Sequence, residues 1–131
     1  MREIIFRGKR IDNGEWVEGC LFVDDKGEKH EILVGYVNYR IAWEVNPETV
    51  GQYTGLTDKN GTKIFEGDIV KVKGRELAPD YHQPDRYYEV KYMLGQFYIG
   101  LNMPIAYKRF SCEVIGNIHD NPELLKGGVE K

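Results

Sequence analysis

The sequence is poor in the residue types that build catalytic and metal centres. Histidine occurs three times and cysteine twice among 131 residues. Cys20 and Cys112 stand far apart in the chain and form no disulfide framework, so we expect two reduced and mostly buried thiols. Cys20 also has no histidine at the spacing of a thiol nucleophile. The scarcity argues against a disulfide scaffold and against cysteine catalysis.

Long apolar runs are missing as well. No stretch approaches the length of about 20 apolar residues that crosses a membrane, and the apolar run at Ile4–Phe6 is far shorter than a signal-peptide core. Hydrophobic residues make up 41% and charged residues 30% of the chain, which is typical of globular proteins. We therefore expect a soluble cytoplasmic protein with a single domain over 1–125 and a flexible tail at 126–131.

An excess of positive charge is also absent. Eighteen basic and twenty-one acidic side chains give a formal charge of −3. A chain with this charge balance is not attracted as a whole to phosphate backbones or anionic lipid, but the balance is compatible with a local basic patch.

No long stretch shows the 3.6-residue period of a helix; turns rich in glycine and asparagine divide the chain into short segments instead. The expected strands cover 4–10, 16–23, 30–34, 37–45, 64–65, 69–72, 87–94, 96–99 and 110–118. Single helical turns are expected after Asn46 and Asn121, and a long surface loop over 75–86. Alternation in 87–94 assigns Tyr88, Val90, Tyr92 and Leu94 to a core face. The pattern predicts an all-β barrel or sandwich.

The stretch from Tyr53 to Val70 organises these strands. Asn60-Gly61 is a strong hairpin signal, because both residues tolerate the positive φ of a type I′ turn. Gly67 allows a second bend, and we expect the Asp68 carboxylate to accept backbone N–H groups there. The residues of this structural motif are Tyr53, Gly55, Leu56, Asp58, Asn60, Gly61, Glu66, Gly67 and Asp68.

Three groupings of carboxylates deserve comparison with known chemistry. Asp80, His82 and Asp85 share a loop but lack the firm spacing of a metal site. The run 58–61 begins like a calcium loop but places its glycine too early. Glu66 and Asp68 would share one face of a strand, although turn formation explains them better. We therefore predict no cofactor, no metal site and no catalytic residue; an enzyme would need a pocket that gathers carboxylates such as these.

The sequence supports a binding role more strongly than a catalytic role. Lys71, Lys73 and Arg75 alternate along one side of a strand and are candidates for nucleic-acid contact. Aromatic and basic residues that could join them are Tyr87, Lys91, Tyr107, Lys108 and Arg109. Lysines on a strand also protect sheet edges, and tyrosines also fill cores, so the pattern does not separate these roles.

Several motifs resemble the YopX family of phage and prophage proteins. They are Phe6-Arg7-Gly8-Lys9-Arg10 with Gly14-Glu15-Trp16-Val17, the run Gln52-Tyr53-Thr54-Gly55-Leu56-Thr57-Asp58-Lys59-Asn60-Gly61, then Ile64-Phe65-Glu66-Gly67-Asp68-Ile69-Val70, and finally Val114-Ile115-Gly116-Asn117-Ile118 with Asn121-Pro122-Glu123-Leu124-Leu125. The resemblance covers both ends and the middle of the chain, and leaves about 75–108 poorly matched.

The resemblance implies a mostly-β domain with an SH3-like barrel and additional β-hairpins. It also implies a gene carried by a phage or prophage, and a family without an established activity. Our leading hypothesis is a non-enzymatic module that binds a protein partner or copies of itself. The alternatives are a nucleic-acid-binding barrel that uses the Lys71-Lys73-Arg75 stripe, and an enzyme built on Glu66, Asp68, His82 and Asp85.

Overall fold

A computed structural model describes residues 4–36, 38–99, 103–104 and 112–125. Two compact units make up the chain, Met1–Gly55 and Leu56–Lys131, and each has its own buried residues. The single domain over 1–125 stays a prediction. The expected tail at 126–131 and three of the binding candidates, Tyr107, Lys108 and Arg109, lie outside the described residues.

The prediction of an all-β fold is confirmed. The first unit contains β1 (Phe6–Lys9), β2 (Trp16–Val23), β3 (His30–Gly35), β4 (Arg40–Val45), the single 3-10 turn η1 (Pro47–Thr49) and the start of β5 (Gly51–Thr57). The second contains β6 (Lys63–Phe65), β7 (Asp68–Val72), β8 (Glu76–Ala78), β9 (Tyr81–His82), β10 (Arg86–Met93), β11 (Gln96–Ile99), β12 (Met103–Pro104), β13 (Cys112–Asn117) and η3 (Pro122–Leu125). No helix within the described ranges is long and apolar enough to span a membrane.

The first unit is an antiparallel sheet in which β1 lies between β2 and β5, and β3 and β4 follow outward from β2. The sheet curls, because Arg10 forms a bridge with Val45 at the far end of β4. Val45 is fully buried, and a Cβ at Gly8 would lie 3.0 Å from its side chain. Among the described residues no sheet closes on itself, so the predicted SH3-like barrel is not confirmed.

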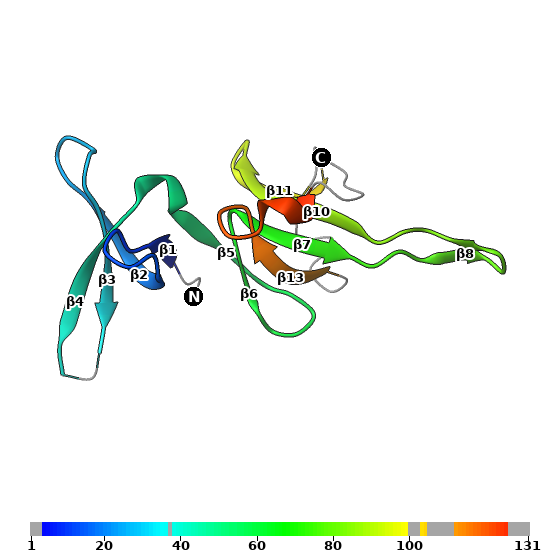
Figure 1. Ribbon diagram of the computed structural model, residues 1–131, viewed down its shortest axis with the longest axis horizontal. Helices are drawn as coiled ribbons and strands as arrows, with labels where there is room; N and C mark the ends of the chain where they lie inside the picture. The colour runs from blue at the N-terminus through cyan, green and yellow to red at the C-terminus, as the bar shows by residue number, and fades with distance from the viewer. Residues whose placement is uncertain (1–3, 37, 100–102, 105–111, 126–131) are drawn as a thin grey trace. The chain divides into compact units, whose positions relative to one another are not determined.

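The second unit is a five-stranded antiparallel sheet in the order β12-β11-β10-β7-β13. Its core contains apolar side chains of one face, Val70, Val90, Ile99 and Cys112, together with Ile64 of β6. On the other face η3 packs beside Gly116, where a Cβ would lie 3.0 Å from a methyl group of Leu124. Figure 1 shows the chain from β7 continuing beyond this sheet to β8 and returning to β10.

The two bends in the central stretch form as predicted, although one turn type differs. Gly61 and Gly67 have φ of 81° and 90°, whereas Asn60 does not have a positive φ. The reversal after β5 is therefore not a type I′ turn. Instead, the Asp58 carboxylate accepts backbone N–H groups of Asn60 and Thr62 and shapes a longer loop. At the second bend Asp68 accepts the N–H of Phe65 at 2.7 Å, as expected.

Three other expectations are wrong. The predicted loop over 75–86 contains the hairpin β8–β9, because backbone pairing continues past β7 through the Gln83 N–H to Arg75 C=O bond. Tyr92 and Leu94 are 52% and 90% exposed rather than buried, since the chain turns at Leu94-Gly95 before the strand can place Leu94 on the core face. Cys20 is exposed on the outward face of β2, and Cys112 alone is a buried thiol.

A candidate binding pocket in the first unit

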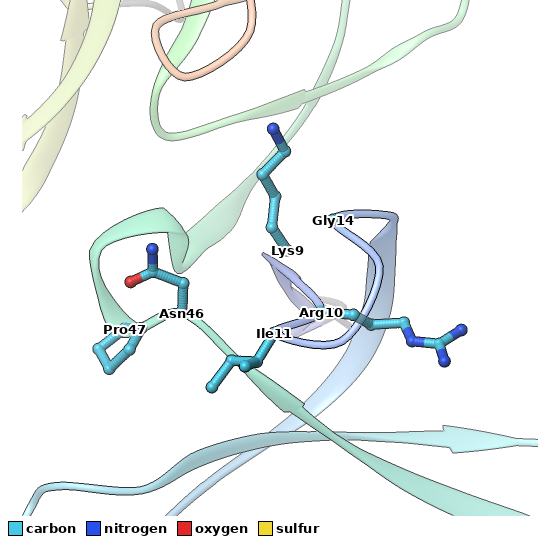
Figure 2. Close-up of a pocket in the computed structure, with 6 residues that line it drawn as sticks. All are labelled: Lys9, Arg10, Ile11, Gly14, Asn46 and Pro47. Carbon is cyan, nitrogen blue, oxygen red and sulfur yellow. The ribbon is translucent and has the colours of Figure 1, made fainter.

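An open pocket of about 430 Å³ lies where the end of β1 meets the start of η1. Its mainly apolar lining comes from two parts of the chain: Lys9, Arg10, Ile11 and Gly14 on one side, and Asn46 and Pro47 on the other. In Figure 2 the Arg10 side chain extends away from Asn46 and Pro47. The apolar side chains at the pocket therefore belong to Ile11 and Pro47, and the Lys9 side chain also extends away from these two residues (Figure 2).

Backbone hydrogen bonds hold the two walls together. The Asn46 N–H donates to the carbonyl of Lys9 at 2.8 Å, and the Ile11 N–H donates to the carbonyl of Glu44 at 3.0 Å. The Lys9 N–H donates to the hydroxyl oxygen of the buried Thr49 at 2.9 Å. Because these bonds cross between β1 and the β4–η1 connection, the pocket has a fixed shape before any ligand arrives.

The turn η1 forms for local reasons. The Asn46 side chain accepts the N–H of Glu48 at 3.0 Å, and Pro47 occupies the first helical position, where its missing N–H is not needed. The predicted cap at Asn46 is thus confirmed. The same residue then serves as a wall of the pocket, because its backbone is bonded to β1.

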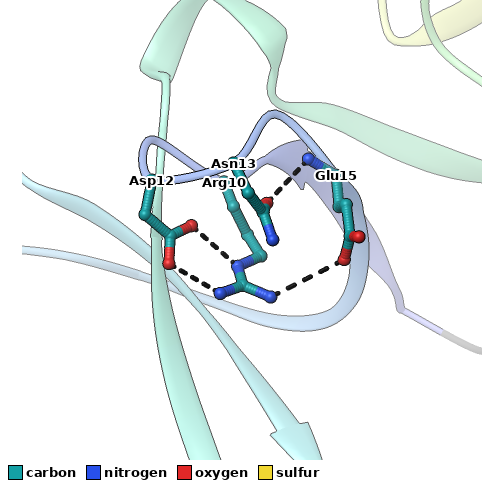
Figure 3. Close-up of polar contacts among 4 residues, drawn as sticks. All are labelled: Arg10, Asp12, Asn13 and Glu15. Atoms are coloured by element: carbon teal, nitrogen blue, oxygen red, sulfur yellow. Dashed lines mark hydrogen bonds and ion pairs between the residues drawn. The ribbon is translucent and has the colours of Figure 1, made fainter.

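Acidic groups hold the guanidinium of Arg10 beside the pocket. Its Nε donates to Asp12 Oδ1 at 2.9 Å and its Nη2 to Asp12 Oδ2 at 2.6 Å, while Nη1 lies 3.7 Å from Glu15 Oε2 (Figure 3). The hydrogen bond to Asp12 raises the pKa of Arg10, and the same bond lowers the pKa of the Asp12 carboxyl. Asn13 completes the turn by accepting the Glu15 N–H at 2.9 Å.

Two tryptophans support the basic residues of β1. The guanidinium carbon of Arg10 lies 3.5 Å from the centroid of the Trp43 ring, and that of Arg7 lies 4.7 Å from the Trp16 ring centroid. The Lys9 ammonium lies 5.7 Å from the same Trp16 centroid. These cation–π contacts restrict the long side chains, so the positive charge beside the pocket is held in place.

The arrangement suits recognition of an uncharged side chain. The pocket combines apolar surface from Ile11 and Pro47 with the polar residue Asn46. It holds none of the carboxylates or histidines that general acid–base chemistry requires. An aliphatic or aromatic side chain would fill it.

The predicted nucleic-acid stripe lies in the second unit. Lys71 lies in β7 opposite Tyr87 and Glu113, and its ammonium is 3.9 Å from Asp85 Oδ2. β7 ends at Val72, so Lys73 and Arg75 follow the strand on the way to β8. Both are exposed. The stripe thus has carboxylates beside it, which reduces its attraction for phosphate.

The carboxylates considered for catalysis do not meet at one place. Asp68 is 1% exposed and bonded to backbone, Glu66 lies in the turn before it, and His82 is exposed in β9. Asp85 accepts the N–H of Gly74 at 2.8 Å. No group of three metal-binding side chains occurs in the described part of the chain.

Sequence reasoning missed the pocket. Its lining residues 9–14 and 46–47 are far apart in the chain, and no local motif connects them. Two local features of the pocket are visible in the sequence. Asn46-Pro47 predicts the cap of η1, and Gly8 beside Lys9 allows the close approach of Val45.

Comparisons with known proteins agree with the fold. The family described as YopX protein matches residues 5–126. The crystal structure of protein EF1440 from Enterococcus faecalis is similar, with 26% sequence identity and a TM-score of 0.59. The similarity covers 95% of this chain and 99% of that one. A search of curated proteins found no match.

Proposed function

The chain belongs to the YopX family, and from this premise we propose that it is a non-enzymatic, protein-binding domain. Its binding site is the pocket between the end of β1 and η1, and its ligand is an apolar side chain of a protein partner. The observation that carries the proposal is the preformed wall, in which Lys9, Ile11 and Asn46 are fixed by backbone bonds around open apolar surface. A preformed pocket loses little conformational entropy when it is filled.

Exposed hairpin ends support a role in protein binding. Tyr36 and Tyr39 stack at the β3–β4 end with ring centroids 4.9 Å apart, and are 47% and 58% exposed. In the second unit Leu77 and Tyr81 are 56% and 51% exposed on the β8–β9 hairpin. Tyrosine at such positions supplies large contact area at low entropic cost, which is typical of protein-recognition surfaces.

Finer features of the proposal rest on the family. We place the protein in the cytoplasm of a bacterial cell and associate its gene with a phage or prophage. The Arg10–Val45 bridge, which links the residue after β1 to the edge strand β4, supports an SH3-like barrel in that unit.

Nuclear magnetic resonance titration with N-acetyl-Leu-Glu-amide tests the pocket. The leucine matches the apolar surface of Ile11 and Pro47. We expect amide shifts concentrated at the pocket residues, and their loss in Ile11→Asp. Ile4→Asp is the matched control, because Ile4 is similarly exposed (61% against 58%) and does not line the pocket. Shifts spread over the whole chain, or equal binding by Ile11→Asp, would contradict the proposal.

A second candidate function is nucleic-acid binding on the face of the second sheet that lies opposite its apolar core. The specific observation is that Lys71 pairs with Tyr87 and Lys91 with Tyr98 across neighbouring strands, which places two lysine–tyrosine pairs on one face. Such pairs can stack bases and contact phosphates. Anisotropy of fluorescein-labelled dT20 at low salt should then rise with protein, and Lys71→Glu with Lys91→Glu should abolish the rise. A flat titration removes this candidate.

A further inference from the structure

The chain contains two Asn-Gly sequences, Asn13-Gly14 between β1 and β2 and Asn60-Gly61 between β5 and β6. Glycine has no side chain to shield its backbone nitrogen, so that nitrogen can approach the side-chain amide of the residue before it. Both glycines face open space, since a Cβ on either would have no heavy atom within 4 Å. The bonds made by each asparagine amide distinguish the two sites.

The Asn13 amide is held against the backbone of its own loop. Its Oδ1 accepts the N–H of Glu15 at 2.9 Å, which keeps the side chain close to the intervening residue, Gly14 (Figure 3). Its Nδ2 makes no hydrogen bond to the residues that the structure describes. A backbone donor therefore faces the oxygen on which negative charge develops when Cγ is attacked, and no bond retains the departing nitrogen.

The loop around Asn13 can open while the sheet stays folded. The Gly14 N–H donates to the carbonyl of Arg10 at 2.9 Å, and the Arg10 N–H donates to the carbonyl of Glu15 at 2.9 Å. Within the described part of the chain, the hydrogen bonds of Asn13 and Gly14 all end inside 10–15, and both residues are exposed. Opening of so local a set of bonds costs little free energy and makes the Gly14 N–H accessible to base.

The Asn60 amide is held differently. Its NH₂ group donates to Glu113 Oε2 at 3.4 Å, which directs the side chain toward β13. The Asn60 N–H donates to Oδ1 of Asp58, whose other carboxylate oxygen accepts the Val114 N–H and which is 5% exposed. Release of the Asn60 amide therefore breaks contacts with a neighbouring strand, which costs more than opening the first loop.

We propose that Asn13 is a site of spontaneous deamidation in the folded protein. Hydroxide removes the Gly14 amide proton, and the nitrogen attacks Cγ of Asn13, so that a new N–Cγ bond closes a succinimide ring. The Cγ–Nδ2 bond breaks, and the nitrogen leaves as ammonia after taking a proton from water. A second water then opens the ring. Cleavage of the new bond gives aspartate at position 13, and cleavage of the original peptide bond gives isoaspartate.

Deamidation alters the pocket, and this part of the inference rests on the proposed function. Gly14 lines the pocket and follows Asn13 in the chain. Aspartate adds a carboxylate beside those of Asp12 and Glu15, which already pair with Arg10. Isoaspartate lengthens the main chain and turns the oxygen that accepts the Glu15 N–H into a main-chain carbonyl, so the turn loses its shape. The pocket therefore loses affinity for an apolar side chain as the product accumulates.

Nuclear magnetic resonance of the full chain tests the deamidation, because each asparagine NH₂ group gives its own pair of ¹H–¹⁵N signals. The protein is incubated at mildly alkaline pH, and samples are returned to mildly acidic pH for recording. In the folded protein the Asn13 pair should disappear while the Asn60 pair persists, and a new Gly14 signal should mark isoaspartate. In urea the two pairs should disappear at similar rates, because glycine follows both asparagines.

Asn60→Gln is the control for the folded sample, and it should leave the decay of the Asn13 signals unchanged. A folded protein in which the Asn60 pair decays as fast as the Asn13 pair would overturn the inference. So would a folded protein in which neither pair decays although both do in urea.

Titration with N-acetyl-Leu-Glu-amide before and after the incubation tests the effect on the pocket. Asn13→Ser is the matched control, because a serine hydroxyl can accept the Glu15 N–H but carries no amide to lose. Incubated wild type should lose the shifts at the pocket residues in proportion to the loss of the Asn13 signals, and incubated Asn13→Ser should keep them. Equal binding before and after complete deamidation would contradict this effect. If fresh wild type shows no shifts at the pocket, the proposed function fails, and the decay of the Asn13 signals decides the deamidation by itself.

Discussion

Replacing Asp58 with asparagine tests how the central loop is fixed in the second unit. Asp58 is 5% exposed; Oδ1 accepts the N–H groups of Asn60 and Thr62, and Oδ2 accepts the Val114 N–H at 2.8 Å. Asparagine can keep the first two bonds through its carbonyl oxygen. Its NH₂ group then faces the Val114 N–H, and because both groups are donors, no hydrogen bond forms between them. An unsatisfied N–H and the lost charge-assisted bond cost about 2 kcal/mol. The melting temperature of a unit of this size should fall by about 10 °C.

Urea unfolding followed by two probes isolates this effect. Trp16 and Trp43, the two tryptophans of the chain, both lie in the first unit, so their fluorescence reports that unit alone. Hydrogen exchange of the Val70 and Val114 amides reports the second. Asp58→Asn should speed exchange about 30-fold, as about 2 kcal/mol requires, and leave the fluorescence transition in place. Asp80→Asn, at an exposed carboxylate, is the control. Equal exchange in the two variants would refute the reasoning.

Three further outcomes follow from packing and burial. Gly19→Ala should destabilise the first unit by more than about 2 kcal/mol in tryptophan-detected unfolding, because its Cβ would lie 2.1 Å from the Leu33 carbonyl oxygen, whereas Gly35→Ala, with nothing within 4 Å, should not. A thiol reagent should label exposed Cys20 rapidly and buried Cys112 only on unfolding; equal rates would contradict the burial. Burial raises the pKa of Cys112 from 9.0 to about 11. The contribution of the neutral thiol to the free energy of unfolding is therefore complete below about pH 9 and is lost as the pH rises toward 11. Cys112→Ala should not show this loss of stability at alkaline pH in urea titrations.

Local signals predicted most of the strands, since their ends coincide with residues of special backbone preference. β2 was predicted with its observed bounds, Trp16–Val23, because Gly14 precedes it and a polar turn follows. The cap at Asn46 and the bends at Gly61 and Gly67 are also local, and they were predicted for the same reason.

Alternation alone misplaced the end of β10. Tyr88 and Val90 point to the core as the period of two requires, but Leu94 follows the last paired residue, Met93, and belongs to the turn. Asparagine at position 94 would have predicted the turn, because it is preferred in type I′ turns. Leucine gives no such signal.

The pocket could not be predicted, because it depends on long-range backbone bonds. The Lys9–Thr49 bond joins residues 40 positions apart, and the Arg10–Val45 bridge depends on how far the sheet curls. No local sequence pattern indicates that these distant segments pair. Likewise, Lys71, Lys73 and Arg75 alternate in sequence, but the strand ends at Val72, before the second and third of them.

The hairpin β8–β9 has a practical consequence. All five of its strand residues are exposed, and so are Pro79 and Asp80 between them. Chain added between Pro79 and Asp80 would disturb neither core, and so this tip is a natural entry point for an epitope or a fluorescent reporter. A chain tagged there would keep the N-terminal segment that leads into β1 in its native sequence, which makes it the form to follow in living cells.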